Sequence, residues 1–493
     1  MKMRTTRSLI ALGATPLLAS CLLRLEPSPD NDENWEASRE GSDVYGAYAG
    51  RVDPGPPRSR EREPAPPLTP VSDDDDGAAA DPGASAPVDM YRELIVLDPS
   101  VLGPLSSNPD DAAPFSFRAQ MQWLAGPAGA LALTRAWLLE WERASAVGPE
   151  LAPVTPRPLV GRLLVDPWVA ASPPAEAAAK AVESEEAAAA DPSAGAAYGE
   201  PELPELPEPP GITPAAALPS WQGAPFNLIA IVNRVDLAND ACEGGAGELR
   251  YVYGALDADG STPLDVTLIL EVPYPTTRSA SEWARAWKDL AALPPGKPYT
   301  QALAELGREI MAESDPLRAR IRTNEIAFAD ADSNAWEMRE FRPAITDGAL
   351  TLVQAPLEFT PRADVEPAEL AAYVLEHADA IESSGASLPE PLRAGAAQIE
   401  SPDFSWNVLG VSERLRQAFS LQTCNGCHGG DTASLPFRHI GPGSSPAAPA
   451  RMSRFLYDPE APSDELRRRL DVVDALGSTE CAPSSSDEEA YGG

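Results

Sequence analysis

The chain is poor in histidine and in positive charge. Its 493 residues include only 3 histidines, and 38 lysines and arginines stand against 75 aspartates and glutamates, which gives a formal net charge of −37. A negative field of this size repels the phosphates of nucleic acids, so DNA and RNA are excluded as partners. So few histidines also leave no defensible serine–histidine–aspartate order, and no catalytic residue is assigned.

Glycine-rich phosphate loops and internal repeats are absent as well. The sequence therefore predicts neither phosphate-loop nucleotide binding nor a repeat architecture. The apolar run at residues 8–19 follows Lys2, Arg4 and Arg7 and is too short for a permanent transmembrane helix. A basic flank and a short apolar run predict an export signal over residues 1–20.

The end of this signal resembles a lipobox. In Leu18-Ala19-Ser20-Cys21 small residues lead directly to a cysteine, and lipoprotein signal peptidase cuts before such a cysteine once it carries lipid. The resemblance implies acylation of Cys21 and attachment to a lipid membrane. Leu22, in place of Asp, implies an outer-membrane lipoprotein that faces the periplasm or the cell surface. An ordinary secretory signal or a short anchor helix is the alternative.

Three segments are predicted to be disordered. Residues 21–88 combine proline and acidic residues with few large apolar ones, which is typical of a tether extended by charge repulsion. Residues 175–214 end in a Pro-Glu-rich run and are expected to form a solvated insertion, with recruitment of a partner by a polyproline arm as the alternative. The tail, residues 482–493, is rich in serine and acids and is expected to fray.

Residues 89–400 are predicted to form an α+β domain. Strands are expected at 226–235, 249–253, 264–272, 317–328, 336–342 and 350–357, and helices at 279–290, 300–312 and 367–381. Ser279 and Glu282 predict a capping box at the start of the first helix. The predicted order along the chain is strands, then a pair of helices, then further strands. Because this order lacks a regular βαβ alternation, it favours a mixed or antiparallel sheet.

The strongest motif is Cys424-Asn425-Gly426-Cys427-His428. Two thiols three positions apart can bond to the two vinyl groups of one haem, and the next residue, His428, is placed to bind the iron. The sequence therefore predicts one covalent haem c. Two alternatives stay open: a disulfide between Cys424 and Cys427, or a zinc site made of Cys424, Cys427, His428 and His439.

Residues 401–481 resemble a minimal class I cytochrome c, in which a helix precedes the haem motif and a second helix closes the block. The closing helix is expected from residue 463 to 477. In that family a downstream methionine is the second axial ligand of the iron. Met452 is the downstream methionine, but its interval from His428 is shorter than the family's, so His439 competes for that role.

A wider resemblance, over residues 225–475, connects the chain to a group of uncharacterised bacterial secreted lipoproteins. It is carried by the segments 230–237 (AIVNRVDL), 247–250 (GELR), 322–325 (RTNE), 339–341 (REF) and 423–428 (TCNGCH). The resemblance implies that the α+β domain and the cysteine motif occur together. Five polar residues in these segments either line a site or tie strands together by ion pairs: Arg234, Asp236, Glu248, Arg322 and Glu325.

Two cysteines remain once Cys21, Cys424 and Cys427 have roles. These are Cys242 and Cys481. Two cysteines are enough for one disulfide, which would attach the C-terminal block to the α+β domain. Two separate free thiols are the alternative.

Together these features favour a membrane-tethered monohaem electron carrier with an unknown redox partner over an enzyme. The alternative is a non-catalytic binding lipoprotein, in which the cysteine block stabilises the fold through a disulfide or a zinc ion. Dihaem peroxidase chemistry is disfavoured because the chain has no second attachment motif.

Overall fold

The computed structural model describes residues 92–106, 113–143, 145–147, 152–172, 220–238, 240–242, 244, 247–326, 328, 335–346, 348–382, 386–432, 437–457 and 463–481. The predicted signal with Cys21, the tether, the insertion at 175–214 and the tail lie outside these residues. Within the described ranges, no helix combines the length and the apolar character needed to cross a membrane.

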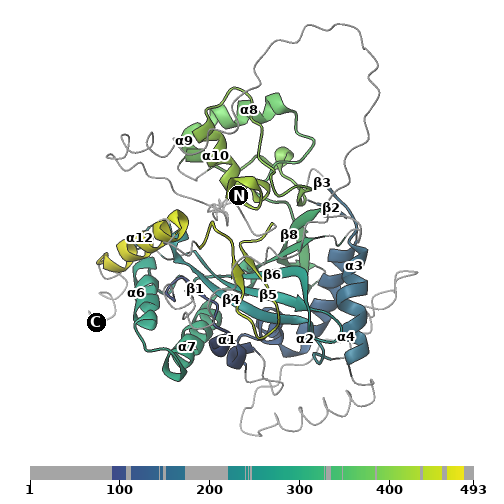
Figure 1. Cartoon of the computed structure of the whole chain (residues 1–493), viewed down its shortest axis with the longest axis vertical. Helices are drawn as coiled ribbons and strands as arrows, with labels where there is room; N and C mark the ends of the chain where they lie inside the picture. Colours follow the sequence, from purple (N-terminus) through teal and green to yellow (C-terminus); the bar gives the residue numbers. More distant parts are fainter. Residues whose placement is uncertain are drawn as a thin grey trace, which may run out of the picture. The chain divides into compact units, whose positions relative to one another are not determined.

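The domain is built on an eight-stranded sheet (Figure 1). Its strand order is β1-β4-β5-β6-β7-β8-β10, with β9 paired to β8, and every pairing is antiparallel. The strands are β1 Ile95–Val96, β4 Phe226–Arg234, β5 Glu248–Leu256, β6 Pro263–Pro273, β7 Arg320–Ile326, β8 Trp336–Thr346, β9 Ala349–Ala355 and β10 Ala397–Ile399. The α+β prediction is confirmed, and the sheet is of the antiparallel kind.

One face of this sheet is apolar. A single row of register partners crosses five strands and consists of Ile231, Tyr251, Leu270, Ile321 and Phe341, all buried. Three helices pack on this side: α1 Pro99–Ser106, α2 Phe117–Glu142 and α7 Lys297–Glu313. Because successive side chains of a strand point to opposite faces, the neighbouring rows point away from this core.

Those neighbouring rows are charged. One runs Val232–Arg250–Glu271–Arg320, and the next runs Val252–Ile269–Arg322–Glu340. Most of these side chains are nevertheless buried or nearly so. The sheet is therefore covered on both faces, with a hydrophobic core on one and a polar layer on the other.

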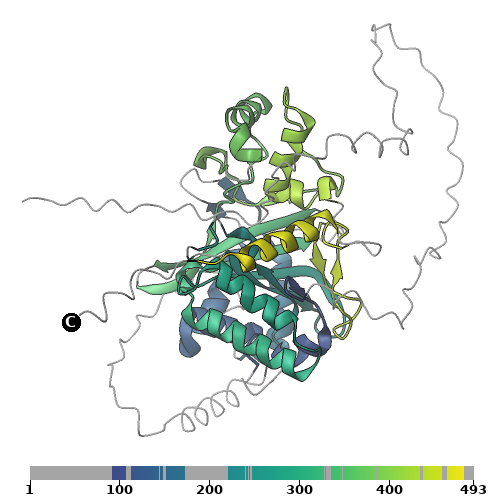
Figure 2. The same ribbon diagram turned by 90° about the vertical axis from the view of Figure 1, so that its left-hand side faces the viewer.

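Helix α6, Ala280–Ala291, begins with the predicted capping box, in which Ser279 and Glu282 bond to each other's backbone N–H. The last helix, α12 Asp464–Ser478, lies beside α6 (Figures 1 and 2). Ser281 of α6 donates to the carbonyl oxygen of Thr479 at 2.6 Å. A disulfide between Cys242 and Cys481 fixes the same end of α12.

The described residues contain several further, shorter elements. They are β2 Ser145–Val147, β3 Ala152–Val154, α3 Pro158–Val160, η3 Gly161–Val165, α4 Asp166–Ala171, η5 Val235–Leu237, η6 Pro316–Arg318, α8 Pro367–Glu376, α9 Ala378–Glu382, η7 Glu390–Leu392, α10 Glu413–Gln422, α11 Cys424–Cys427, η8 Gly430–Thr432, β11 Ile440–Gly441 and β12 Arg451–Met452. The single helix predicted at 367–381 is interrupted at His377, which ends α8.

The predicted cytochrome c-like arrangement of residues 401–481 is not confirmed. Helix α10 packs with α8 and α9 in a hydrophobic cluster of its own, which includes Leu370, Ile381 and Phe419. Helix α12 instead packs against α6 in the main core. The two helices expected to enclose the motif therefore pack on different neighbours.

Candidate functional site

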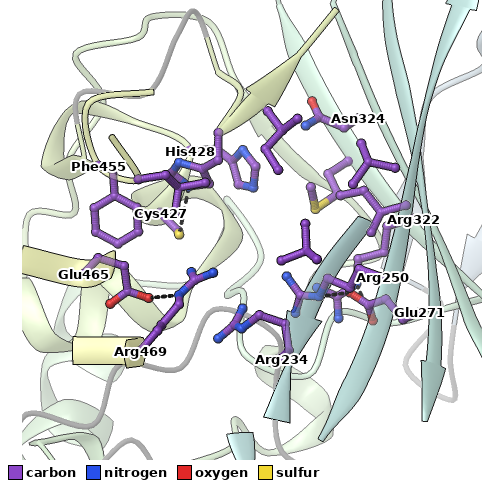
Figure 3. A pocket seen from close by; sticks show the side chains of 17 residues that line it. Arg234, Arg250, Glu271, Arg322, Asn324, Cys427, His428, Phe455, Glu465 and Arg469 are labelled. Atoms are coloured by element: carbon purple, nitrogen blue, oxygen red, sulfur yellow. Dashed lines mark hydrogen bonds and ion pairs between the residues drawn. The ribbon is translucent and has the colours of Figure 1, made fainter. Parts of the chain in front are cut away.

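A pocket lies between the charged face of the sheet and the cysteine motif (Figure 3). Its empty space, counted out to the open solvent, is about 750 Å³. The strands contribute Val232, Arg234, Arg250, Val252, Ile269, Glu271, Arg322, Asn324 and Met338, and the C-terminal segments contribute Cys427, His428, His439, Ile440, Phe455, Leu456, Glu465 and Arg469. The site thus combines residues that are about 200 positions apart in the sequence.

The motif forms one helical turn. Thr423 caps it by accepting a hydrogen bond from the backbone N–H of Gly426 at 3.0 Å, and the N–H of His428 donates to the carbonyl oxygen of Cys424 at 2.9 Å. Cys424 and Cys427 are the first and last residues of this turn, and His428 follows it directly. Both thiols are buried, and neither takes part in a disulfide.

His428 is held in one orientation. Its Nδ1 lies 2.9 Å from the carbonyl oxygen of Phe437, and its ring stacks on Trp336 with 4.9 Å between the ring centroids. Because a carbonyl can only accept, Nδ1 carries the proton and Nε2 carries the lone pair. Burial, together with the charges of Arg322 and Arg250, lowers the pKa of His428 to about 4. The imidazole is therefore neutral at neutral pH.

Phe437 itself adopts a left-handed backbone conformation, with φ at +60°. This region is unfavourable for a side chain of its size, and such residues cluster at functional sites. The strained residue is the one whose carbonyl oxygen orients His428.

His439 lies next to His428, with 4.7 Å between the ring centroids. Its Nε2 is 3.3 Å from the sulfur of Cys427, and its Nδ1 is 3.1 Å from the hydroxyl of Ser453. Burial lowers its pKa well below the ordinary value for histidine. Met452 pairs with Ile440 on the neighbouring strand but packs against the main core and does not line the pocket. Of the two candidate ligands, the structure brings His439 to the site.

The sheet side of the pocket carries arginines that are fixed by carboxylates. Arg250 is 2.5 Å from Glu248, and Arg322 is 2.7 Å from Glu340. Glu271 lies between these arginines on β6, at 3.4 Å from Arg250 and 3.6 Å from Arg322. These are ion-pair distances, yet neither oxygen of Glu271 has a hydrogen-bond partner among the described residues. Burial raises the pKa of Glu271, and Arg322 partly offsets that rise.

A second set of ion pairs connects the sheet to α12. Arg234 lies 2.9 Å from Asp236, which also contacts Arg468 at 3.2 Å. Arg469 lies 2.6 Å from Glu465. Although burial raises it, the charges of Arg234 and Arg469 hold the pKa of Asp236 well below its usual value. Helix α12 therefore supplies part of the pocket's charge.

The polar residues singled out from the sequence divide between the two faces. Arg234 and Arg322 line the pocket, and Asp236 and Glu248 hold arginines in place. Glu325 points to the opposite face and contacts Arg157 at 2.6 Å.

Sequence reasoning missed Glu271, Arg250 and Arg469 as lining residues. Alternating charges at 248, 250, 320 and 322 were the available signal, but this pattern is also typical of a solvated strand face.

In the part of the chain that the structure describes, no group of three or more histidine, cysteine, aspartate or glutamate side chains is arranged to hold a metal ion. Comparison with protein-family models, curated proteins and solved structures found no match. The function is therefore argued from the site itself.

Proposed function

We propose that this protein is a membrane-tethered c-type haem lipoprotein that transfers electrons in the cell envelope. The observation that carries the proposal is the folded Cys424–His428 turn, which presents the Cys427 thiol and a neutral His428 to a pocket and holds a second buried thiol, Cys424, in the same turn. Bound haem would supply an iron that alternates between the ferrous and ferric states. The acylated Cys21 and the tether at 21–88 would hold the domain to an outer membrane, facing the periplasm or the cell surface.

The residues of the turn fit covalent attachment. Cys424 and Cys427 would each hold the haem through one vinyl group: the sulfur would bond to one vinyl carbon and the thiol hydrogen would pass to the other. The addition consumes one S–H and one C=C bond per cysteine and needs no oxidant. It requires reduced cysteines, and both are thiols in the structure.

His428 also fits the role of iron ligand. Histidines that bind metals usually donate their second ring N–H to a carbonyl or carboxylate, which fixes the ring and directs the other nitrogen to the metal. The bond from Nδ1 to Phe437 has this form. Apolar lining residues such as Val252, Ile269 and Phe455 suit a macrocycle. His439 lines the pocket and Met452 does not, so His439 rather than Met452 would be the further residue available to the iron.

The test is expression in a bacterial host that attaches haem c. We expect a haem-stained band after denaturing electrophoresis and a visible spectrum that changes on reduction. Cys424→Ser and Cys427→Ser should each weaken attachment, and the double variant should lose it. Glu376→Gln, a change at an exposed carboxylate on α8 away from the motif, is the control and should keep the stain.

A colourless wild-type protein from such a host would refute the proposal. Elemental analysis and peptide mapping of the same sample then distinguish a structural zinc ion from a structural disulfide. Stoichiometric zinc would identify a zinc site, and a Cys424–Cys427 bridge would identify a disulfide. The anchor is tested separately with Cys21→Ala, which should move the protein from the membrane fraction to the soluble fraction.

A further inference from the structure

We propose that the charged face of the sheet binds the two carboxylates of the tetrapyrrole, with Arg250 and Arg322 as their principal partners. The inference rests on the proposed haem function and names the residues that would hold the far edge of the cofactor. It assigns a role to a buried polar layer that the attachment turn alone does not explain.

Arg250 and Arg322 lie across the pocket from the attachment turn. In haem the vinyl groups and the propionates occupy opposite edges of the macrocycle, so attachment at Cys427 directs the carboxylates away from the turn. Figure 3 shows Cys427 and His428 on one side of the pocket and Arg250 and Arg322 on the other. A macrocycle attached to the turn and lying in this pocket would therefore direct its acidic edge toward the sheet.

Both arginines are also held in fixed orientations by carboxylates. Arg250 and Arg322 come from β5 and β7, on either side of β6, and each is oriented by its own carboxylate, Glu248 or Glu340. A guanidinium held in this way loses little side-chain entropy when a further acid binds. Its planar fork of donors suits carboxylates in particular.

The side chains that line the pocket carry more positive than negative charge. Among the lining side chains, four arginines face two glutamates. The pocket lining therefore carries an excess of positive charge, which favours an acidic ligand. When the residues that hold the arginines are included, six arginines (234, 250, 320, 322, 468 and 469) still exceed five carboxylates (236, 248, 271, 340 and 465).

Glu271 lies between the two arginines and makes no hydrogen bond through its carboxylate to the described residues. Its carboxyl is almost completely buried, and neither oxygen has a hydrogen-bond partner among the described residues. Its charge is balanced instead by ion pairs with Arg250 and Arg322, at 3.4 and 3.6 Å. Its position between Arg250 and Arg322 marks where acidic groups from a ligand would compete for the same two guanidinium groups.

The experiment separates acid recognition from haem attachment. In the full chain carrying Cys424→Ser and Cys427→Ser, iron-free protoporphyrin IX and its dimethyl ester are titrated by fluorescence. The ester has the same macrocycle without the two negative charges. We expect the acid to bind at least about tenfold more tightly, because charge-assisted hydrogen bonds to arginine are lost in the ester.

Arginine variants in the same background locate the recognition. Arg322→Gln should weaken the acid about tenfold and leave the ester unchanged, and Arg322→Lys should restore part of the difference. Arg342→Gln is the matched control, because Arg342 also pairs with Glu340 but does not line the pocket. Arg250→Gln is a second test if Arg322→Gln fails to fold.

Equal affinities for acid and ester in the unmodified pocket would overturn the inference, and so would an equal effect of Arg322→Gln and Arg342→Gln. Neither result touches the proposed function, which is measured by covalent haem in the wild-type protein. A wild-type protein without haem refutes the function, and with it the identity of the ligand.

Discussion

Cys481, just beyond the end of α12, is disulfide-bonded to Cys242, which follows β4, although 239 positions separate them in the sequence. Their Cα atoms are 5.3 Å apart. The bridge holds the helix that brings Glu465 and Arg469 to the pocket. A covalent bond far from the haem motif therefore supports one wall of the site.

Loss of this bridge should destabilise the domain. A disulfide that closes so long a loop restricts the unfolded chain, and its removal typically costs 2–5 kcal/mol. Cys242→Ser, Cys481→Ser and the double variant should lower the free energy of unfolding by similar amounts, because each removes the same bond. Denaturant titration without reductant measures this. An additive double variant would show that the cysteines act separately.

Acid should destabilise the protein through Glu340. Although burial raises it, the charges of Arg322, Arg320 and Arg342 lower the pKa of Glu340 to about 2. A carboxylate whose folded pKa is below its unfolded value contributes stability above the unfolded pKa near 4.5 and loses it as the pH falls toward 2. The contribution at neutral pH is on the order of 3 kcal/mol.

Glu340→Gln tests this. Its cost in unfolding free energy should be large at pH 7 and should shrink as the pH falls from about 4.5 to 2. Glu376→Gln, a change at an exposed carboxylate on α8, should follow the wild-type curve. A cost of Glu340→Gln that is independent of pH would contradict the assignment.

Gly426 should not tolerate a side chain. A Cβ at this position would collide with the backbone carbonyl of Ser420, which cannot move without unwinding the end of α10. Gly426→Ala should distort the turn and reduce the yield of covalent haem. Gly441→Ala is the control, since its Cβ would approach nothing closer than Arg438 at 4.0 Å. Equal haem yields from the two variants would show that the turn adapts.

Two arginines of β8 should differ sharply in their effect on stability. Arg339 is fully buried, contacts Glu337 at 2.6 Å and donates to the carbonyl oxygen of Trp141 at 3.0 Å. Arg339→Met removes a buried cation from Glu337, which keeps its contact with Arg157, and removes the donor to Trp141, and it should cost about 3–5 kcal/mol. Arg342 is 40% exposed, so Arg342→Met should cost less than about 1 kcal/mol. Thermal or denaturant unfolding of both variants gives the comparison.

Sequence patterns predicted the elements whose signals are local. The alternation of residues 264–272 identified β6, and the pair Ser279 and Glu282 identified the start of α6. The cysteine count singled out the pair that the structure joins, Cys242 and Cys481. Each signal depends on a few neighbouring residues or on the number of cysteines, so it can be recognised without knowing the tertiary structure.

The helices before residue 172 were missed. Helix α2 contains Gly126 and Pro127 in its middle, with Gly126 at a φ of +72°, and this interruption hides a helical period. Its buried residues, among them Trp137 and Trp141, are recognisable as core only once the sheet is present.

The composition of the pocket could not be predicted for a similar reason. Glu271 and Glu325 are both strand glutamates, yet one faces the pocket and the other faces Arg157. Strand register and the placement of α12 decide which face each occupies, and both depend on contacts between distant segments.

The two unlike faces of the sheet also bear on how the chain is made. A nascent chain that has reached residue 399 contains every strand of the sheet and the helices that cover its apolar face. The face still waiting for the C-terminal segments is the charged one, which water solvates well. On this face charged residues are mixed with Val232, Val252 and Ile269, and the wall that completes the pocket is added last.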